Sequence, residues 1–212
     1  MKLNRRSVLG AIGLVGVGTG AAFGSGAFTS TTAERAVEVN VFGDGDGPDG
    51  VVELPSDDEE DIADTITDNI VDVLVDTSPS SVSVRGGGND YEGSDLFPGE
   101  DAYNGDFEDF VSLVANDVTI VFGNDGGLPP NSELGYGELF AFVPNSDDSL
   151  TFDVTFGDDD QGELLTSVSG ELVSDGAVVP VSDGSSDPVD AEVQTGTESP
   201  EGEELDIRIE EQ

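Results

Sequence analysis

An extreme excess of acidic residues dominates this chain. Its 212 residues include 47 Asp and Glu against 6 Lys and Arg, which gives a formal net charge of -41 at pH 7. At ordinary ionic strength, so much like charge repels itself and opposes compaction. At molar salt the Debye length shrinks to about 3 Å, and the repulsion is largely screened. The composition therefore predicts a halophilic protein. The alternative is an acidic disordered chain, because high net charge and few aromatic residues favour disorder.

Charge and missing residue types also exclude several functions. Nucleic acids and anionic membranes would repel this chain, because binding them needs clustered Lys and Arg. The sequence has no Cys and no His, so it offers no thiolate or imidazole to bind zinc or activate a nucleophile. It also has no Gly-x-Ser-x-Gly motif and no phosphate-binding glycine loop. We expect a protein that is not an enzyme, has no catalytic residues and binds no nucleic acid.

The first 27 residues have the order of a secretory signal peptide. A short basic head precedes an apolar run over residues 8–17, and small residues follow up to Ala27. The apolar run is too short for a transmembrane helix, which needs about 20 residues. Arg5 and Arg6 stand before one variable and two apolar residues, which resembles a twin-arginine export motif. The alternative is an ordinary basic head with two adjacent arginines.

The end of this segment predicts where the signal peptide is removed. Ser25 and Ala27 are the small residues that a signal peptidase requires, and Phe28 would begin the mature chain. Residues 20–22 are an alternative cleavage region. Without a Cys for lipid attachment or an apolar stretch near the C-terminus, we expect no stable membrane anchor after cleavage. Residues 28–212 are therefore predicted to form an acidic domain that is extracellular or at the cell surface.

Apolar residues alternate with polar ones along much of this domain. Val37, Val39 and Val41 alternate with polar or larger residues, and residues 150–156 follow the same period of two. Further apolar runs lie at residues 70–75, 82–84, 118–122, 139–143, 164–173, 177–181, 189–193 and 205–209. Such alternation places one face of each strand on a core, and Gly, Asn and Asp between the runs favour turns. We predict a single all-β domain, an Ig-like or jelly-roll-like β-sandwich.

Two segments carry a helical pattern, and we expect at most one helix. Residues 57–66 have acids in a first turn, with Ile62 and Ile66 four residues apart. Residues 106–113 place Phe107, Phe110 and neighbouring apolar residues on one helical face.

Residues 43–50 are the best candidate for a metal site. Asp44, Asp46 and Asp49 lie between glycines, and carboxylates on a flexible loop are the ligands that Ca²⁺ prefers. The stretch departs from an EF-hand loop because no Glu occupies the twelfth position. The alternative is a flexible acidic turn with no bound ion, and we expect no cofactor.

The segment after the signal, residues 27–41, joins an Ala-Phe pair and a run of Ser and Thr directly to the Val37, Val39 and Val41 strand. It resembles exported haloarchaeal proteins with a SipW-type signal region. It is also similar to the start of the TasA/camelysin group of extracellular fibre subunits. The resemblance covers residues 1–42. It implies a β-sandwich whose N-terminal segment completes the sheet of the next subunit, as in biofilm-matrix filaments.

Two functions fit these features of the sequence. The first is a structural subunit of an extracellular filament or surface matrix, whose partner is another copy of itself. In it, Val37, Val39 and Val41 form a donor strand, because a neighbouring sheet can satisfy the unpaired backbone groups of a free extended arm. The second is a monomeric secreted or envelope-associated β-sandwich that binds other cell-surface proteins. A monomer should keep its first strand in its own sheet.

Overall fold

The computed structural model describes most of the chain after residue 34. The described residues are 35–40, 50–54, 59–99, 102–103, 107–123, 127–144, 150–158, 164–182, 188–196 and 203–212. The chain divides into two compact units, Met1–Thr31 and Thr32–Gln212, and the described residues belong to the second. The predicted signal peptide therefore lies outside the described residues. No helix in the described part is long and apolar enough to cross a membrane.

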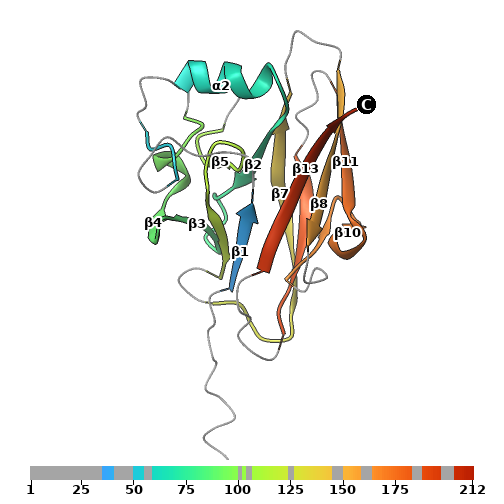
Figure 1. The fold of residues 1–212 in the computed structure, drawn as a ribbon. Coiled ribbons are helices and arrows are strands. Elements are labelled where there is room, and N and C mark those ends of the chain that lie inside the picture. Colours follow the sequence, from blue (N-terminus) through green and yellow to red (C-terminus); the bar gives the residue numbers. More distant parts are fainter. Residues whose placement is uncertain are drawn as a thin grey trace, which may run out of the picture. The chain divides into compact units, whose positions relative to one another are not determined.

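The second unit is built from two β-sheets (Figure 1). The 7-stranded sheet has, in spatial order, β11 (Ala177–Ser182), β8 (Thr151–Asp158), β13 (Glu203–Glu211), β1 (Arg35–Asn40), β6 (Thr119–Phe122), β3 (Val82–Gly86) and β4 (Asn89–Tyr91). The 6-stranded sheet has β10 (Glu171–Leu172), β9 (Leu165–Val168), β12 (Val189–Gln194), β7 (Glu133–Val143), β2 (Asp72–Asp76) and β5 (Phe110–Ser112). Neighbouring strands in each sheet often come from distant parts of the sequence.

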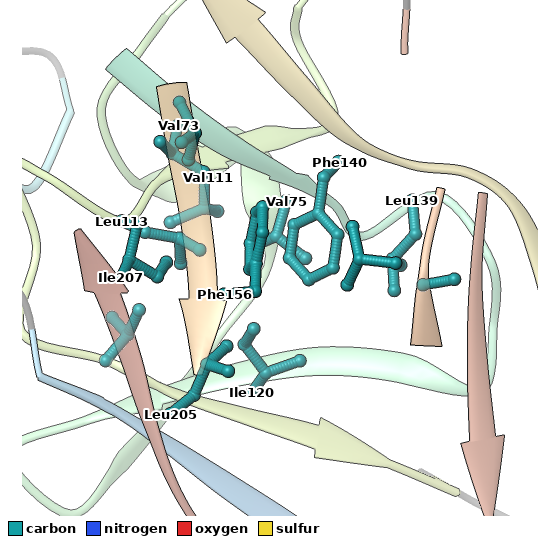
Figure 2. Packing of buried hydrophobic residues seen from close by; sticks show 14 of the residues in the cluster. Val73, Val75, Val111, Leu113, Ile120, Leu139, Phe140, Phe156, Leu205 and Ile207 are labelled. Atoms are coloured by element: carbon teal, nitrogen blue, oxygen red, sulfur yellow. The ribbon is translucent and has the colours of Figure 1, made fainter. Parts of the chain in front are cut away.

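The inner faces of the two sheets bury one hydrophobic core. Phe140 of the 6-stranded sheet and Phe156 of the 7-stranded sheet lie with ring centroids 5.0 Å apart, and Figure 2 shows them beside Val75. Leu205 and Ile120 add to the same cluster from the 7-stranded sheet. Every second residue is buried along the first part of β13 and throughout β11, as a strand with one core face requires. The predicted all-β sandwich is confirmed.

The first predicted helix is present. Helix α2 (Glu59–Thr67) begins with Glu59, Glu60 and Asp61, whose negative charges favour a helix N-terminus. Ala63 and Ile66 face the core and are buried. Besides α2, the described residues contain two short 3-10 turns, η2 (Gly93–Asp95) and η3 (Val173–Asp175).

The second helical candidate, residues 106–113, is not a helix in its described part, so the described residues hold one α-helix. Residues 110–112 form the edge strand β5, and Phe110 donates its N–H to the Phe107 carbonyl in the preceding turn, at 3.0 Å. Strand β5 pairs with β2 in antiparallel register, and Val111 is fully buried. Phe and Val suit a pleated, half-buried surface, so pairing with β2 overrides the helical spacing.

The run over residues 164–173 is a hairpin and not one strand. Ser169 and Gly170, between β9 and β10, have φ of 53° and 78°. Positive φ at both central residues matches the twist of the flanking strands, and it is typical of two-residue hairpin turns. Gly87 and Gly88 make a similar turn between β3 and β4, with φ of 53° and 88°, where a turn was predicted.

Candidate functional site

Strand β1 lies in the interior of the 7-stranded sheet, between β13 and β6 (Figure 1). It pairs with β13 in parallel and with β6 in antiparallel orientation. Val37 is level with Glu203 on one side and Ile120 on the other, and Val39 is level with Leu205. The β1–β13 pair is the parallel one among the strand pairs of the described residues; the others are antiparallel.

We call the place that β1 occupies between β13 and β6 the β1 slot. The flanking residues Glu203, Leu205 and Ile120 are 4%, 0% and 1% exposed, so the slot borders the core. Strands β13 and β6 do not pair with each other, because β1 separates them. Without β1 each would present a row of unpaired N–H and C=O groups to the gap. The first strand therefore makes the 7-stranded sheet continuous.

Glu203 joins the two sheets at the edge of the slot. Its carboxylate accepts hydrogen bonds from the backbone N–H groups of Leu164 and Leu165, with the second at 3.3 Å. Glu203 belongs to β13, and the residues that it binds open β9 of the other sheet. The sequence does not single out Glu203, because it stands in an acidic run. Its spacing of two residues from Leu205 and four from Ile207 indicates that it shares their buried face of the strand.

The outer edges of both sheets give little backbone for a further strand. Strands β4 and β5 are 3 residues long, and β10 has 2 residues. The longer edge strand β11 has Pro180, which has no N–H, and the N–H of Val178 is bonded to the Glu171 carboxylate at 3.2 Å. Short strands, proline and side-chain caps are how sheets avoid edge-to-edge pairing.

A second buried polar cluster lies on β2, around Asp72. The Ser112 hydroxyl donates to Asp72 Oδ1 at 2.6 Å, and the Tyr103 hydroxyl donates to Oδ2 at 2.7 Å. The backbone N–H groups of Val73 and Val114 complete the set of donors. Asp72 is 0% exposed, yet these groups satisfy its carboxylate.

Burial governs the acidity of this cluster. Loss of hydration raises the pKa of Asp72 from its ordinary value of 3.8 to about 6, although the hydrogen bonds to Ser112 and Tyr103 oppose that rise. Burial also raises the pKa of the Tyr103 hydroxyl, and the negative charge of Asp72 raises it further. Asp72 therefore changes charge in a pH range where exposed carboxylates are ordinarily ionised.

Asn116 extends the cluster to the segment that follows the first strand. Its side-chain amide donates to the carbonyls of Phe97 and Ser112, at 3.0 and 2.8 Å. Its side-chain oxygen accepts the N–H of Val52 at 2.7 Å. The chain that resumes at Gly50 is therefore anchored to the body of the domain near its beginning.

Few of the predicted site residues fall in the described part. Val37 and Val39 lie in β1, whereas Val41 lies outside the described residues. The same holds for the export and cleavage residues Arg5, Arg6, Ser25, Ala27 and Phe28, and for the candidate calcium ligands Asp44, Asp46 and Asp49. Within the described ranges, no three acidic side chains come together in a group that could hold a metal ion.

No family model, no curated protein and no solved structure matches this chain. Function is therefore inferred from its residues and their geometry.

Proposed function

We propose that this chain is a non-catalytic structural subunit of an extracellular filament or surface matrix. In it, β1 of one copy fills the β1 slot of the next copy. The observation that carries the proposal is the interior position of β1: a strand from one end of the chain completes a sheet between two strands that do not pair with each other. A strand in such a position can be supplied by the same chain or by a neighbour without changing the sheet.

The length of the connection sets how far a donated strand can reach. Residues 41–49 separate β1 from Gly50, where the described chain resumes. A fully extended stretch of this length spans at most about 35 Å. If each copy gives β1 to the next, the contact is head-to-tail, and a head-to-tail contact that does not close into a ring produces a filament.

Two further features support addition at the slot. The short or capped outer edges of the sheets leave the slot as the better place to add a strand. The net charge of -41 opposes close approach of two copies at low ionic strength, so assembly belongs in molar salt. Together with the signal-like first 27 residues, the charge supports a protein that a halophile exports, with the twin-arginine route as the proposed path.

One observation favours the alternative, a monomeric secreted binding module. In the isolated chain, β1 fills its own slot, as a monomer requires. The two functions therefore differ in which copy supplies β1, and a covalent test can separate them.

The test uses the register of the parallel pair. Glu38 is level with the exposed Glu204 on β13, and the chain has no Cys of its own. A chain carrying both Glu38→Cys and Glu204→Cys, oxidised in molar salt, should give a ladder of linked copies on a non-reducing gel. Neighbouring strands bring such residues within the Cα separation that a disulfide bridges, about 4.4–6.8 Å. Electron microscopy of the same sample should show filaments.

The matched control carries Glu38→Cys with Glu210→Cys, which lies farther along β13 and out of register with β1. It should give no ladder. If the in-register variant is instead bridged within single copies, and no filaments form in molar salt, the filament function is refuted and the monomeric module takes its place.

A further inference from the structure

The two oxygens of Asp72 meet two hydroxyl groups that differ in their freedom to turn. Ser112 is fully buried, and its oxygen also accepts the N–H of Ala115 at 2.9 Å, which fixes it from a second side. Tyr103 is only half-buried, and among the described residues its hydroxyl bonds to Asp72 alone. Of the two hydroxyls, that of Tyr103 is the one that can change direction.

A proton on Asp72 changes what this carboxyl can accept. An ionised carboxylate is an acceptor only, so both hydroxyls donate to it. A protonated carboxyl carries one O–H, which must itself donate. Placed on Oδ2, that proton points at the Tyr103 oxygen, and the Tyr103 hydrogen loses its acceptor. The bond also loses its charge assistance, and charge-assisted hydrogen bonds are roughly twice as strong as neutral ones.

The surroundings of Asp72 leave Tyr103 as its one titratable hydrogen-bond partner among the described residues. Strand β5 packs on one side of β2 and offers Phe110, Val111 and Ser112. On the other side, β7 offers residues 140–143, which are Phe, Ala, Phe and Val. Neither neighbour adds a charge. On β2 itself, Asp76 lies at the far end of the strand, where its carboxylate binds Ser78.

Tyr103 is also a central member of a row of aromatic rings. Its ring meets Phe97 edge-on at 5.8 Å and Phe107 at 6.3 Å, and Phe107 meets Phe110 at 5.5 Å. A change in how Tyr103 is held therefore reaches rings on both sides of it.

We propose that Asp72 and Tyr103 form a proton-operated latch. When Asp72 is ionised, it accepts the Tyr103 hydrogen bond and holds the Ala102–Tyr103 segment tightly against β2; when Asp72 is protonated, this bond reverses direction, loses its charge assistance and holds that segment less tightly. The latch does not depend on whether the chain assembles. It gives an exported protein a face that responds to mild acid in salt concentrations that screen its surface charges.

The test follows the ring signals of the tyrosines by NMR between about pH 5 and 7.5 in molar salt, with Tyr103→Phe used to assign the Tyr103 signal. The pKa of Asp72, about 6, predicts a shift of the Tyr103 signal with its midpoint near that pH. In Asp72→Asn the Tyr103 signal should stay constant. Tyr136 is the internal control, because its hydroxyl is buried and has no hydrogen-bond partner among the described residues. Its signal should not follow this transition.

A second measurement keeps the proposal open to refutation if Asp72→Asn does not fold. Tyr103→Phe keeps the ring and removes one donor from the carboxylate, so the Asp72 carboxyl, followed by its carbon signal, should titrate at higher pH than in the wild type. A Tyr103 signal that stays flat in the wild type would overturn the latch. So would an Asp72 midpoint that is the same in Tyr103→Phe and the wild type.

Discussion

Asp72 and Glu203 are the two acidic residues that the described structure buries almost completely, at 0% and 4% exposure, and different donors hold them. Asp72 receives hydrogen bonds from two hydroxyls and from backbone amides, whereas Glu203 receives hydrogen bonds from the backbone amides of Leu164 and Leu165. An amide can only donate, but a hydroxyl can donate or accept. Asp72 therefore has partners that can adapt to a proton, whereas the two amides that bind Glu203 need acceptor oxygens.

The difference reflects the shortage of bases in this chain. After residue 28 the sequence has only Arg35, Arg85 and Arg208 as basic residues. A buried acid in most proteins is paired with a cation, because an unpaired buried charge is costly. Here the hydroxyls of Ser112 and Tyr103 and backbone amides satisfy Asp72, so this buried carboxylate is held by groups that carry no charge.

Removing Glu203 should have the largest effect. In Glu203→Ala the buried N–H groups of Leu164 and Leu165 lose their acceptor, and with it the hydrogen bonds that connect β13 to the other sheet. Each unsatisfied buried donor costs about 1–3 kcal/mol, so we expect the free energy of unfolding to fall by about 3 kcal/mol. Denaturant unfolding in molar salt measures it.

The neighbouring Glu204→Ala is the matched control, because Glu204 is exposed on the same strand. Its effect should stay within about 0.5 kcal/mol. Equal losses in the two variants would contradict the structural role of Glu203. The loss in Glu203→Ala should also change little with salt, because screening acts mainly on exposed charges.

The pH dependence of Asp72 should be the next largest effect. Its folded-state pKa, about 6, is above the ordinary 3.8, so the folded state binds this proton more readily than the unfolded state. The stability that follows is fully present below pH 3.8 and is lost as pH rises through 6. Relative to Asp72→Asn, the wild type should gain about 2 kcal/mol of unfolding free energy between pH 7 and pH 4.5.

Comparison with Asp72→Asn is needed because protonation of the many exposed acids also changes stability in this range. Those groups are common to both proteins and cancel in the difference. Suppose the difference in unfolding free energy between the wild type and Asp72→Asn does not change with pH, or changes in the opposite direction. The pKa of Asp72 is then not raised in the folded state.

The exposed ion pair between Arg85 and Asp90 should matter least. Its atoms are 2.7 Å apart across the β3–β4 hairpin, but the side chains are 38% and 74% exposed. Exposed pairs contribute about 0.2–1 kcal/mol, and less in high salt. A double-mutant cycle with Arg85→Gln and Asp90→Asn should give a coupling below about 0.5 kcal/mol in molar salt. A coupling of several times that size would show that surface pairs stabilise this fold as its buried acids do.

The sequence predicts the strands well and the site only in part. Alternation places Phe152, Val154, Phe156, Leu205 and Ile207 correctly on the core, because a period of two follows from strand geometry alone, although Leu150 at the start of its run is exposed. The helical spacing of residues 106–113 misleads at β5, where pairing with β2 decides the structure. Asp72 is visible as an acid inside an apolar run, but nothing local identifies its partners, since Tyr103 and Ser112 are 31 and 40 residues away. The interior position of β1 depends on β13, which is much more remote in sequence, since Val37 pairs with Glu203.

The pairing of β1 with β13 has a consequence for how the protein is made. Strand β1 leaves the ribosome well before β13, the last strand of the described residues. Until residues 203–211 emerge, β1 can pair only with β6 and β8 only with β11, so the two parts of the 7-stranded sheet are not joined. Sheets closed by such distant partners form slowly, because a long loop must close before the contacts stabilise it. The sheet can therefore become continuous only after residues 203–211 have emerged, and until then the side of β1 that pairs with β13 stays open.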